Sequence, residues 1–123
     1  MKIPENLHYT AEHLWIRQQD DGSWLAGITD YAQDLLGDIV YVEAPVAGTS
    51  IIAGTPCGLV ESVKTGSDLH APANGTVVAI NEVLQSTPED INEKPYDAWI
   101  FSFTANDTPS NLLNAEQYRA LLG

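Results

Sequence analysis

Residues 57–76 read CGLVESVKTGSDLHAPANGT, and this pattern predicts a β-hairpin with Lys64 at its tip. The residues before Lys64 are mostly apolar, a second apolar segment begins at Leu69, and the polar residues between them are typical of a turn. A lysine at such a tip points into solvent. Position alone therefore indicates only a solvated turn residue, since lysine side chains are rarely fully buried.

The hairpin sequence ends in one copy of a short repeat. Residues 44–49 (APVAGT) recur at residues 71–76 as APANGT, and an apolar run follows each copy. Proline removes a donor from a strand ladder and glycine allows a positive φ, so each copy can end one strand, turn, and begin the next. The repeat suggests two similar halves, although the same residue types are common in unrelated turns.

Other apolar runs predict that most of the chain is β. They are rich in β-branched and aromatic residues and are separated by turn residues such as Asp20-Asp21-Gly22. We expect strands at residues 14–16, 24–28, 39–42 and 99–103. Aromatic residues at strand positions usually pack in a core or at its ends, and we assign no chemistry to Trp15, Trp24 and Trp99.

Capping signals predict three short helices at the edges of the strands. A cap at Asp30 and a glycine at Gly37 indicate a helix at about residues 31–36. The sequence TPED at residues 87–90 predicts a second helix, with proline in the first turn. Asn114 caps a third, whose apolar side is expected to be formed by Tyr118, Leu121 and Leu122.

Length and charge limit the possible partners. The chain has 123 residues, the size of an ordinary domain, and we expect residues 1–123 to form one unit. Seventeen acidic and five basic residues give a net charge of -12, so nucleic acids and anionic membranes would repel it. Such a field favours encounters with proteins that present basic patches. We therefore expect protein partners, with no nucleic acid and no membrane.

Cysteine usage and the first residues favour a cytoplasmic location. The lone Cys57 cannot form an internal disulfide, which fits a reducing compartment, and its apolar neighbours predict a buried, inert thiol. The first residues lack the apolar run of a signal peptide, and no stretch approaches the length of a membrane span.

The remaining chemistry-bearing residues form no recognisable reactive pattern. The histidines His8, His13 and His70 lack the spacing of a metal site. No nucleophile motif surrounds Ser62, and the glycines do not precede the lysine of a phosphate-binding loop. We predict no metal site and no catalytic residue in this chain.

The sequence around Lys64 resembles the modification site of glycine cleavage system H proteins. The match consists of residues 61–64 (ESVK), Ser67-Asp68, Ala71-Pro72 and Gly75. The resemblance continues on both sides and covers nearly the whole chain, roughly from Tyr9 to Leu122. It includes residues 27–33, 36–38, 78–81, 92–96, 99–100 and 113–122.

This resemblance implies a fold and a cofactor. The fold would be a flattened, mainly β barrel-sandwich hybrid of the lipoyl/biotinyl-carrier type, with short peripheral helices and a C-terminal helix. Lys64 would bear lipoic acid in an amide bond. Glu61 would help the lipoylating enzyme find this lysine, and Asp68 matches a family position near the lipoyl arm.

The same resemblance implies a non-catalytic carrier in glycine catabolism. A pyridoxal-phosphate-dependent glycine decarboxylase would load an aminomethyl group onto the arm. A folate-dependent aminomethyltransferase would then take the carbon and release ammonia, and a dihydrolipoyl dehydrogenase would reoxidise the dithiol. A flexible arm suits this transfer because tethering raises the effective concentration of the reactive group at each partner.

Two other carrier roles stay open. The chain could be an H-like lipoyl carrier or lipoyl donor that serves other lipoate-dependent enzymes. A biotin carrier fits less well, because biotin sites of this general fold typically flank the lysine with methionines, whereas Val63 and Thr65 flank Lys64 and Met1 is the only methionine. A stand-alone enzyme is the weakest alternative, since no motif supports turnover.

The chain differs from many members of the family at a position near the lipoyl arm that carries the aminomethyl group. Many H proteins read His-Glu-Trp where this chain reads His13-Leu14-Trp15, and that glutamate is taken to help hold the arm. Some members also have a histidine where Leu35 stands. Leu14 offers only apolar contact, so we expect a less protected cargo. Asp68 remains available, and Glu12 and Asp30 could contribute if they face the same groove.

Overall fold

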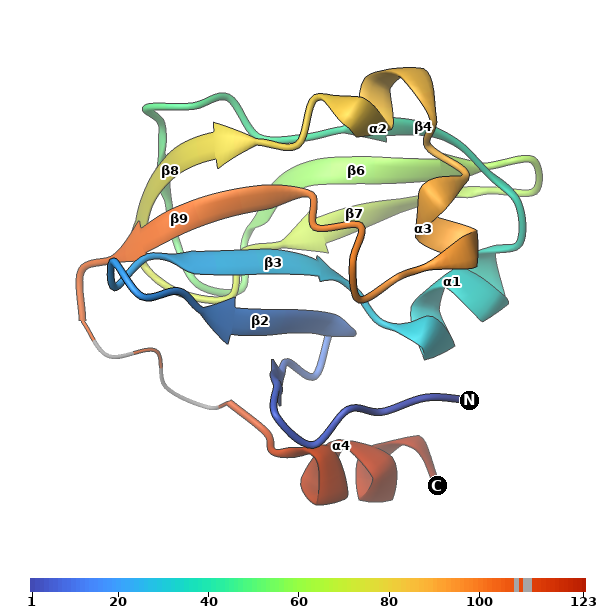
Figure 1. Cartoon of the computed structure of the whole chain (residues 1–123), viewed down its shortest axis with the longest axis horizontal. Helices are drawn as coiled ribbons and strands as arrows, with labels where there is room; N and C mark the ends of the chain where they lie inside the picture. The colour runs from blue at the N-terminus through green and yellow to red at the C-terminus, as the bar shows by residue number, and fades with distance from the viewer. Residues whose placement is uncertain (108, 110–111) are drawn as a thin grey trace.

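The computed structural model describes residues 1–107, 109 and 112–123. In these residues, nine strands and four short helices form two antiparallel sheets (Figure 1). The larger sheet has the order β1-β2-β3-β9-β8-β5 and the smaller sheet the order β4-β6-β7. The strands are β1 (His8–Tyr9), β2 (Leu14–Gln18), β3 (Trp24–Ile28), β4 (Ile39–Glu43), β5 (Ser50–Ile51), β6 (Pro56–Ser62), β7 (Gly66–His70), β8 (Gly75–Ile80) and β9 (Phe101–Ala105).

The main hydrophobic core lies between the two sheets. Ile16 and Phe101 of the larger sheet and Val42 and Val60 of the smaller sheet belong to one cluster and are at most 2% exposed. The sheets therefore pack face to face, which confirms the predicted β-sandwich character of the fold. Within the described part of the chain they remain two separate sheets and do not close into a barrel.

A second, smaller core lies on the other face of the larger sheet. It includes Trp15 of β2 and Tyr118 of α4 (Ala115–Leu122), and both side chains are fully buried. Because side chains alternate across a strand, Leu14 and Ile16 enter the main core while Trp15 enters the second one. The start of β2 is therefore apolar throughout because both of its faces are covered.

The short helices begin close to the predicted capping signals. The helices before α4 are α1 (Asp30–Leu36), α2 (Val83–Ser86) and α3 (Asp90–Glu93). The cap of α1 is Thr29, whose Oγ1 accepts a hydrogen bond from the N–H of Ala32, and not Asp30 as the sequence predicted. Thr87 ends α2, a helix that the sequence did not predict, and α3 begins three residues later.

The ends of the last two elements were predicted only in part. The Asn114 cap is confirmed, because its side chain accepts from the N–H of Gln117 while the side chain of Gln117 accepts from the N–H of Asn114. Leu121 is 50% exposed, so its predicted place on the packed side of α4 is wrong. The last strand begins at Phe101 rather than at Trp99.

Both copies of the repeat connect the smaller sheet to the larger one. Residues 44–49 lead from β4 to β5, and residues 71–76 lead from β7 into β8. β5 and β8 then pair, with Ile51 opposite Gly75. The N–H of Gly48 also donates to the carbonyl oxygen of Val77 at 2.8 Å, so the two connections meet at one edge of the larger sheet.

The repeated glycines have different physical roles. Gly48 has φ +89° and open space around its Cα, so it supplies a turn conformation that other residues rarely adopt. Gly75 is instead needed for close approach, because a Cβ there would lie 2.0 Å from the backbone oxygen of Thr104 in β9. The glycine at the same place in the two copies is therefore needed for two different reasons, a turn conformation in one copy and close backbone approach in the other.

We predict that Gly75→Ala lowers the free energy of unfolding more than Gly48→Ala does. The first substitution forces the β8–β9 ladder apart and should cost about 3 kcal/mol or more, as severe overpacking does. The second introduces only a left-handed conformation at an alanine, which costs about 1–2 kcal/mol. Urea unfolding of both variants measures the difference, and an equal or smaller loss for Gly75→Ala would contradict this explanation.

Candidate functional site

The β6–β7 hairpin carries Lys64 at its tip, as the sequence predicted. The strands pair with Glu61 opposite Gly66 and Val60 opposite Ser67, and Lys64 lies in the exposed turn between them. Figure 1 shows this hairpin extending beyond the rest of the sandwich, next to α1. The lysine is therefore accessible to another protein from the end of the molecule.

Ser62 organises the turn that presents the lysine. Its hydroxyl accepts hydrogen bonds from the N–H groups of Lys64 (3.2 Å) and Thr65 (3.1 Å) and donates to the carbonyl oxygen of Thr65 (3.1 Å). The N–H of Val63 donates to the carbonyl oxygen of Asp38, which attaches the tip to the loop after α1. Ser62 therefore stabilises the turn that carries Lys64.

The residue that ends α1, Gly37, lies next to the side chain of Lys64. Gly37 has φ +84°, and a Cβ there would lie 3.0 Å from Cε of Lys64. Asn92 holds the end of α1 in place, since its side-chain N–H groups donate to the carbonyl oxygen of Gly37 and to Oε1 of Gln33. The side-chain oxygen of Asn92 also accepts from the N–H of Ile39 at 2.8 Å. No local sequence pattern indicates this long-range contact.

A groove of about 110 Å³ opens beside the hairpin, between β7, α1 and the start of β2. We call it the β7 groove. Its floor is apolar and buried, and its rim carries two exposed carboxylates, those of Glu12 and Asp68. The floor consists of Leu14, Ile28, Leu36, Val60 and Leu69.

The groove brings together most of the residues that the sequence singled out around the arm. Leu14 is 1% exposed and lies in the floor, whereas Leu35 is 57% exposed and lies on the wall formed by α1. Glu12 shares the groove with Asp68, but Asp30 does not line it. The carboxylate of Asp30 instead accepts from the backbone N–H of Lys2 and from the side chain of Gln33.

Burial shifts the pKa values of His13 and Cys57 in opposite directions. Burial lowers the pKa of His13 in the groove wall and is opposed by the nearby charge of Glu12, so its imidazole is neutral at pH 7. Burial raises the pKa of Cys57 to about 11. The thiol is therefore protonated at neutral pH, and a protonated thiol is a poor nucleophile.

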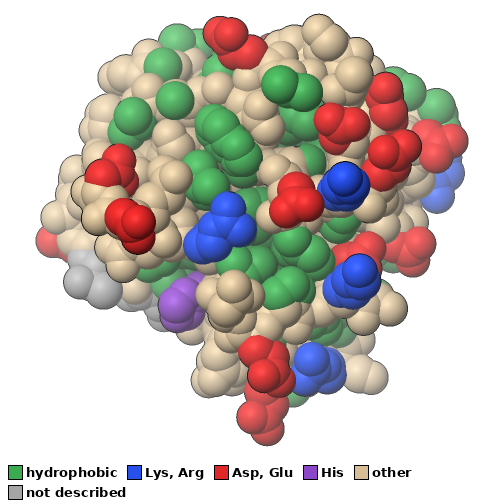
Figure 2. All heavy atoms as spheres, in the orientation of Figure 1, with side chains coloured by type: hydrophobic (Ala, Val, Ile, Leu, Met, Phe, Trp, Pro, Cys, Tyr) green, Lys and Arg blue, Asp and Glu red, His purple; other side chains and the backbone are tan. Residues whose placement is uncertain are grey.

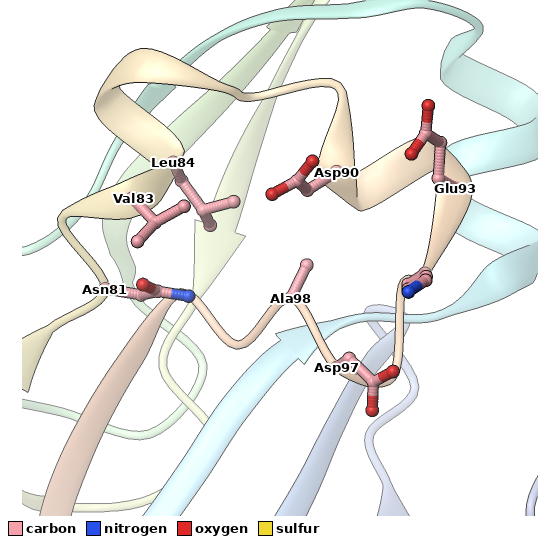
Figure 3. Close-up of a pocket in the computed structure, with 8 residues that line it drawn as sticks. Asn81, Val83, Leu84, Asp90, Glu93, Asp97 and Ala98 are labelled. Carbon is pink, nitrogen blue, oxygen red and sulfur yellow. The ribbon is translucent and has the colours of Figure 1, made fainter.

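A larger hollow lies elsewhere, beside α2 and α3. It has a volume of about 270 Å³, and Figure 3 shows the carboxylates of Asp90, Glu93 and Asp97 around it. No residue of the β6–β7 hairpin lines it. Across residues 1–107, 109 and 112–123, no group of three histidine, cysteine or carboxylate side chains has an arrangement that could hold a metal ion.

Acidic side chains surround the end of the molecule that presents Lys64. In Figure 2 they gather on the right, where Figure 1 places the hairpin tip, α1 and α3. Glu61 is exposed near the tip, and Asp34, Asp38 and Asp68 are also exposed. Within the described residues, no helix is long and apolar enough to cross a membrane.

Two packed sheets, a lysine at an exposed hairpin tip and an apolar groove beside it define a carrier domain of the lipoyl/biotinyl type. Residues 7–123 match the sequence model of one family of such carriers, described as glycine cleavage H-protein. The chain belongs to this glycine cleavage H-protein family.

Similar proteins agree with this assignment. The chain is 73% identical to the glycine cleavage system H protein of Methylobacillus flagellatus over 123 residues, which cover all of both chains. It is 51% identical to the H protein of Geobacillus kaustophilus, covering 99% of this chain and 98% of the relative. The crystal structure of an H protein from Mycobacterium marinum superimposes with a TM-score of 0.91 at 40% identity, covering 98% of this chain and 99% of that one.

Proposed function

We propose that this chain is the lipoyl-bearing carrier of the glycine cleavage system, with lipoic acid in an amide bond to Lys64. The observation that carries this proposal is the exposed lysine at the tip of a hairpin whose strands line a groove with an apolar floor. An accessible amine suits enzymatic acylation, and buried leucine, isoleucine and valine side chains suit an aliphatic chain. The residues present therefore fit the cofactor.

Each part of the site has a defined task in this proposal. When bound, lipoic acid supplies a dithiolane that can accept electrons and a one-carbon amine. Lys64 tethers this group, and the floor around Leu14 shelters it from water. The amine of the aminomethyl cargo is a cation at neutral pH, and the carboxylates of Glu12 and Asp68 on the rim would stabilise it.

We infer that the chain carries the cargo while its partners catalyse. The partners are the pyridoxal-phosphate-dependent glycine decarboxylase, the folate-dependent aminomethyltransferase, dihydrolipoyl dehydrogenase and the lipoylating enzyme. The acidic surface around the hairpin favours docking sites with basic rims, because opposite charges steer the approach of two proteins. No side chain of this chain is assigned a catalytic role.

We further propose that residues 1–123 act as one domain in the cytoplasm. Two hydrophobic clusters on opposite faces of one sheet tie the ends of the chain to its middle, which supports a single unit. A lone cysteine with a protonated thiol suits a reducing compartment.

An H-like carrier that donates lipoyl groups to other lipoate-dependent enzymes is the second candidate. The same exposed lysine would serve both roles, and only the partners differ. Reconstitution with glycine decarboxylase and the aminomethyltransferase separates them, because a relay protein would accept lipoic acid without supporting glycine-dependent release of ammonia.

We predict that Lys64→Arg abolishes lipoylation and all support of glycine decarboxylation while the protein stays folded. An exposed tip contributes little to stability, so the melting temperature should barely change. Intact-protein mass before and after treatment with a lipoylating enzyme measures the modification, and Lys94→Arg is the matched control. A lipoyl mass increment on the Lys64→Arg protein would refute the assignment, and a biotinyl increment on the unaltered protein would favour a biotin carrier.

Glu61 is predicted to take part in recognition by the lipoylating enzyme. It is exposed three residues before Lys64, so Glu61→Ala should slow lipoylation and shift the melting temperature by no more than about 2–4 °C. Glu43→Ala removes another exposed carboxylate from the smaller sheet and should leave the rate unchanged. Equal lipoylation rates for the two variants would show that Glu61 only adds surface charge.

Because this chain has Leu14 where many H proteins have a glutamate, we predict that the aminomethyl group on its lipoyl arm is poorly protected. Leu14→Glu should slow the loss of ammonia and formaldehyde from aminomethyl-loaded protein in the absence of the aminomethyltransferase, since a carboxylate in the floor can pair with the cationic amine. Leu14→Gln has the same length without the charge and controls for packing. Both variants should be less stable, because Leu14 is a core residue. If folded Glu and Gln variants release ammonia equally fast, charge at position 14 does not protect the cargo.

A further inference from the structure

One buried hydroxyl of the last helix contacts residues of two elements that form the β7 groove. The hydroxyl of Tyr118 is 2.8 Å from Nδ1 of His13 and 2.8 Å from Oγ1 of Thr29. His13 lines the groove on the side of β2, and Thr29 caps α1, which forms another wall. The N–H of Thr29 also donates to the carbonyl oxygen of His13 at 3.1 Å.

The wall that contains His13 depends on an unusual backbone conformation. His13 has φ +71°, the only positive φ outside glycine among the described residues. Such a conformation is uncommon for a residue with a side chain and persists where surrounding contacts hold it. The N–H groups of His13 and Leu14 donate to Thr10, and the imidazole packs against the ring of Tyr31 with 4.9 Å between centroids.

The turn at His13 places the neighbouring residues in the groove. Glu12 reaches the rim and Leu14 reaches the floor because the chain reverses between them. In the wall formed by α1, Oγ1 of Thr29 fixes the first turn of the helix by accepting from the N–H of Ala32, which also lines the groove. Tyr118 therefore contacts the two residues that set the positions of both walls.

We propose that Tyr118 is a positioning residue for the arm: its hydroxyl holds His13 and Thr29 together and so sets the shape of the β7 groove. This role rests on the proposed carrier function and adds to it a contribution from the C-terminal helix. Tyr118 touches neither the arm nor the cargo. It acts through the turn at His13 and through the cap of α1.

The molecule contains a matched control for this hydroxyl. Tyr9 stacks on Tyr118 with 4.7 Å between ring centroids and 7° between ring planes, and both side chains are fully buried. The hydroxyl of Tyr9 donates to the carbonyl oxygen of Pro4 and does not reach the groove. Tyr118→Phe and Tyr9→Phe therefore each remove one buried hydroxyl from the same aromatic pair, but only one of them affects the groove walls.

The first test uses the unmodified protein and measures amide hydrogen exchange. Tyr118→Phe should accelerate exchange at the amides of Leu14 and Ala32 by about tenfold, because two hydrogen bonds that hold the walls are lost. Tyr9→Phe should leave these two amides unchanged. Identical exchange at these amides in the two variants, or an equal acceleration over the whole of the Tyr118→Phe chain, would overturn the proposal.

A second test measures the cargo. Aminomethyl-loaded Tyr118→Phe protein should lose ammonia several-fold faster than loaded Tyr9→Phe protein, and equal rates would overturn the role toward the arm. If Tyr118→Phe does not fold, His13→Asn serves instead, because asparagine tolerates a positive φ but lacks the imidazole. Lipoylation of Lys64→Arg protein would refute the carrier function, whereas the exchange comparison would still decide whether Tyr118 shapes the groove.

Discussion

The pairing between β6 and β7 positions the residues of the site, because side chains alternate between the two faces of a sheet. With Val60 opposite Ser67, Val60 and Leu69 face the core and form part of the groove floor, while Glu61 faces solvent. A slip of one residue would exchange these faces and bury the carboxylate of Glu61. The hydrogen bonds of Ser62 to the turn oppose such a slip, since they fix where the chain reverses.

The groove is built on elements that have little freedom to move. Leu14 belongs to a strand that is covered on both faces, by the main core on one side and by the second core under α4 on the other. The side chain of Asn92 forms hydrogen bonds both to Gly37 at the end of α1 and to Ile39 of β4, so it holds these two elements together. The flexible component of the proposed carrier is therefore the lysine side chain with its arm, and the protein around it is a rigid support.

Much of this arrangement could be predicted from local sequence, and the parts that could not depend on distant contacts. The turn residues around Lys64 indicate the hairpin, and Asn114 indicates α4. The cap of α1 was misplaced by one residue because Thr29 and Asp30 are both good caps. α2 was missed because Glu82, the residue at its N-cap position, is not among the residues preferred there. The contact between His13 and Tyr118 spans 105 residues, and no local pattern reveals it.

The position of Tyr118 in α4, far along the chain from the hairpin, also affects the order in which the site forms during synthesis. The hairpin around Lys64 depends mainly on local hydrogen bonds, so it can form as soon as β6 and β7 have left the ribosome. Tyr118 follows roughly 2–10 s later at about 5–20 residues per second. On a nascent chain, a modifying enzyme could therefore meet the lysine before the two walls of the groove have been joined.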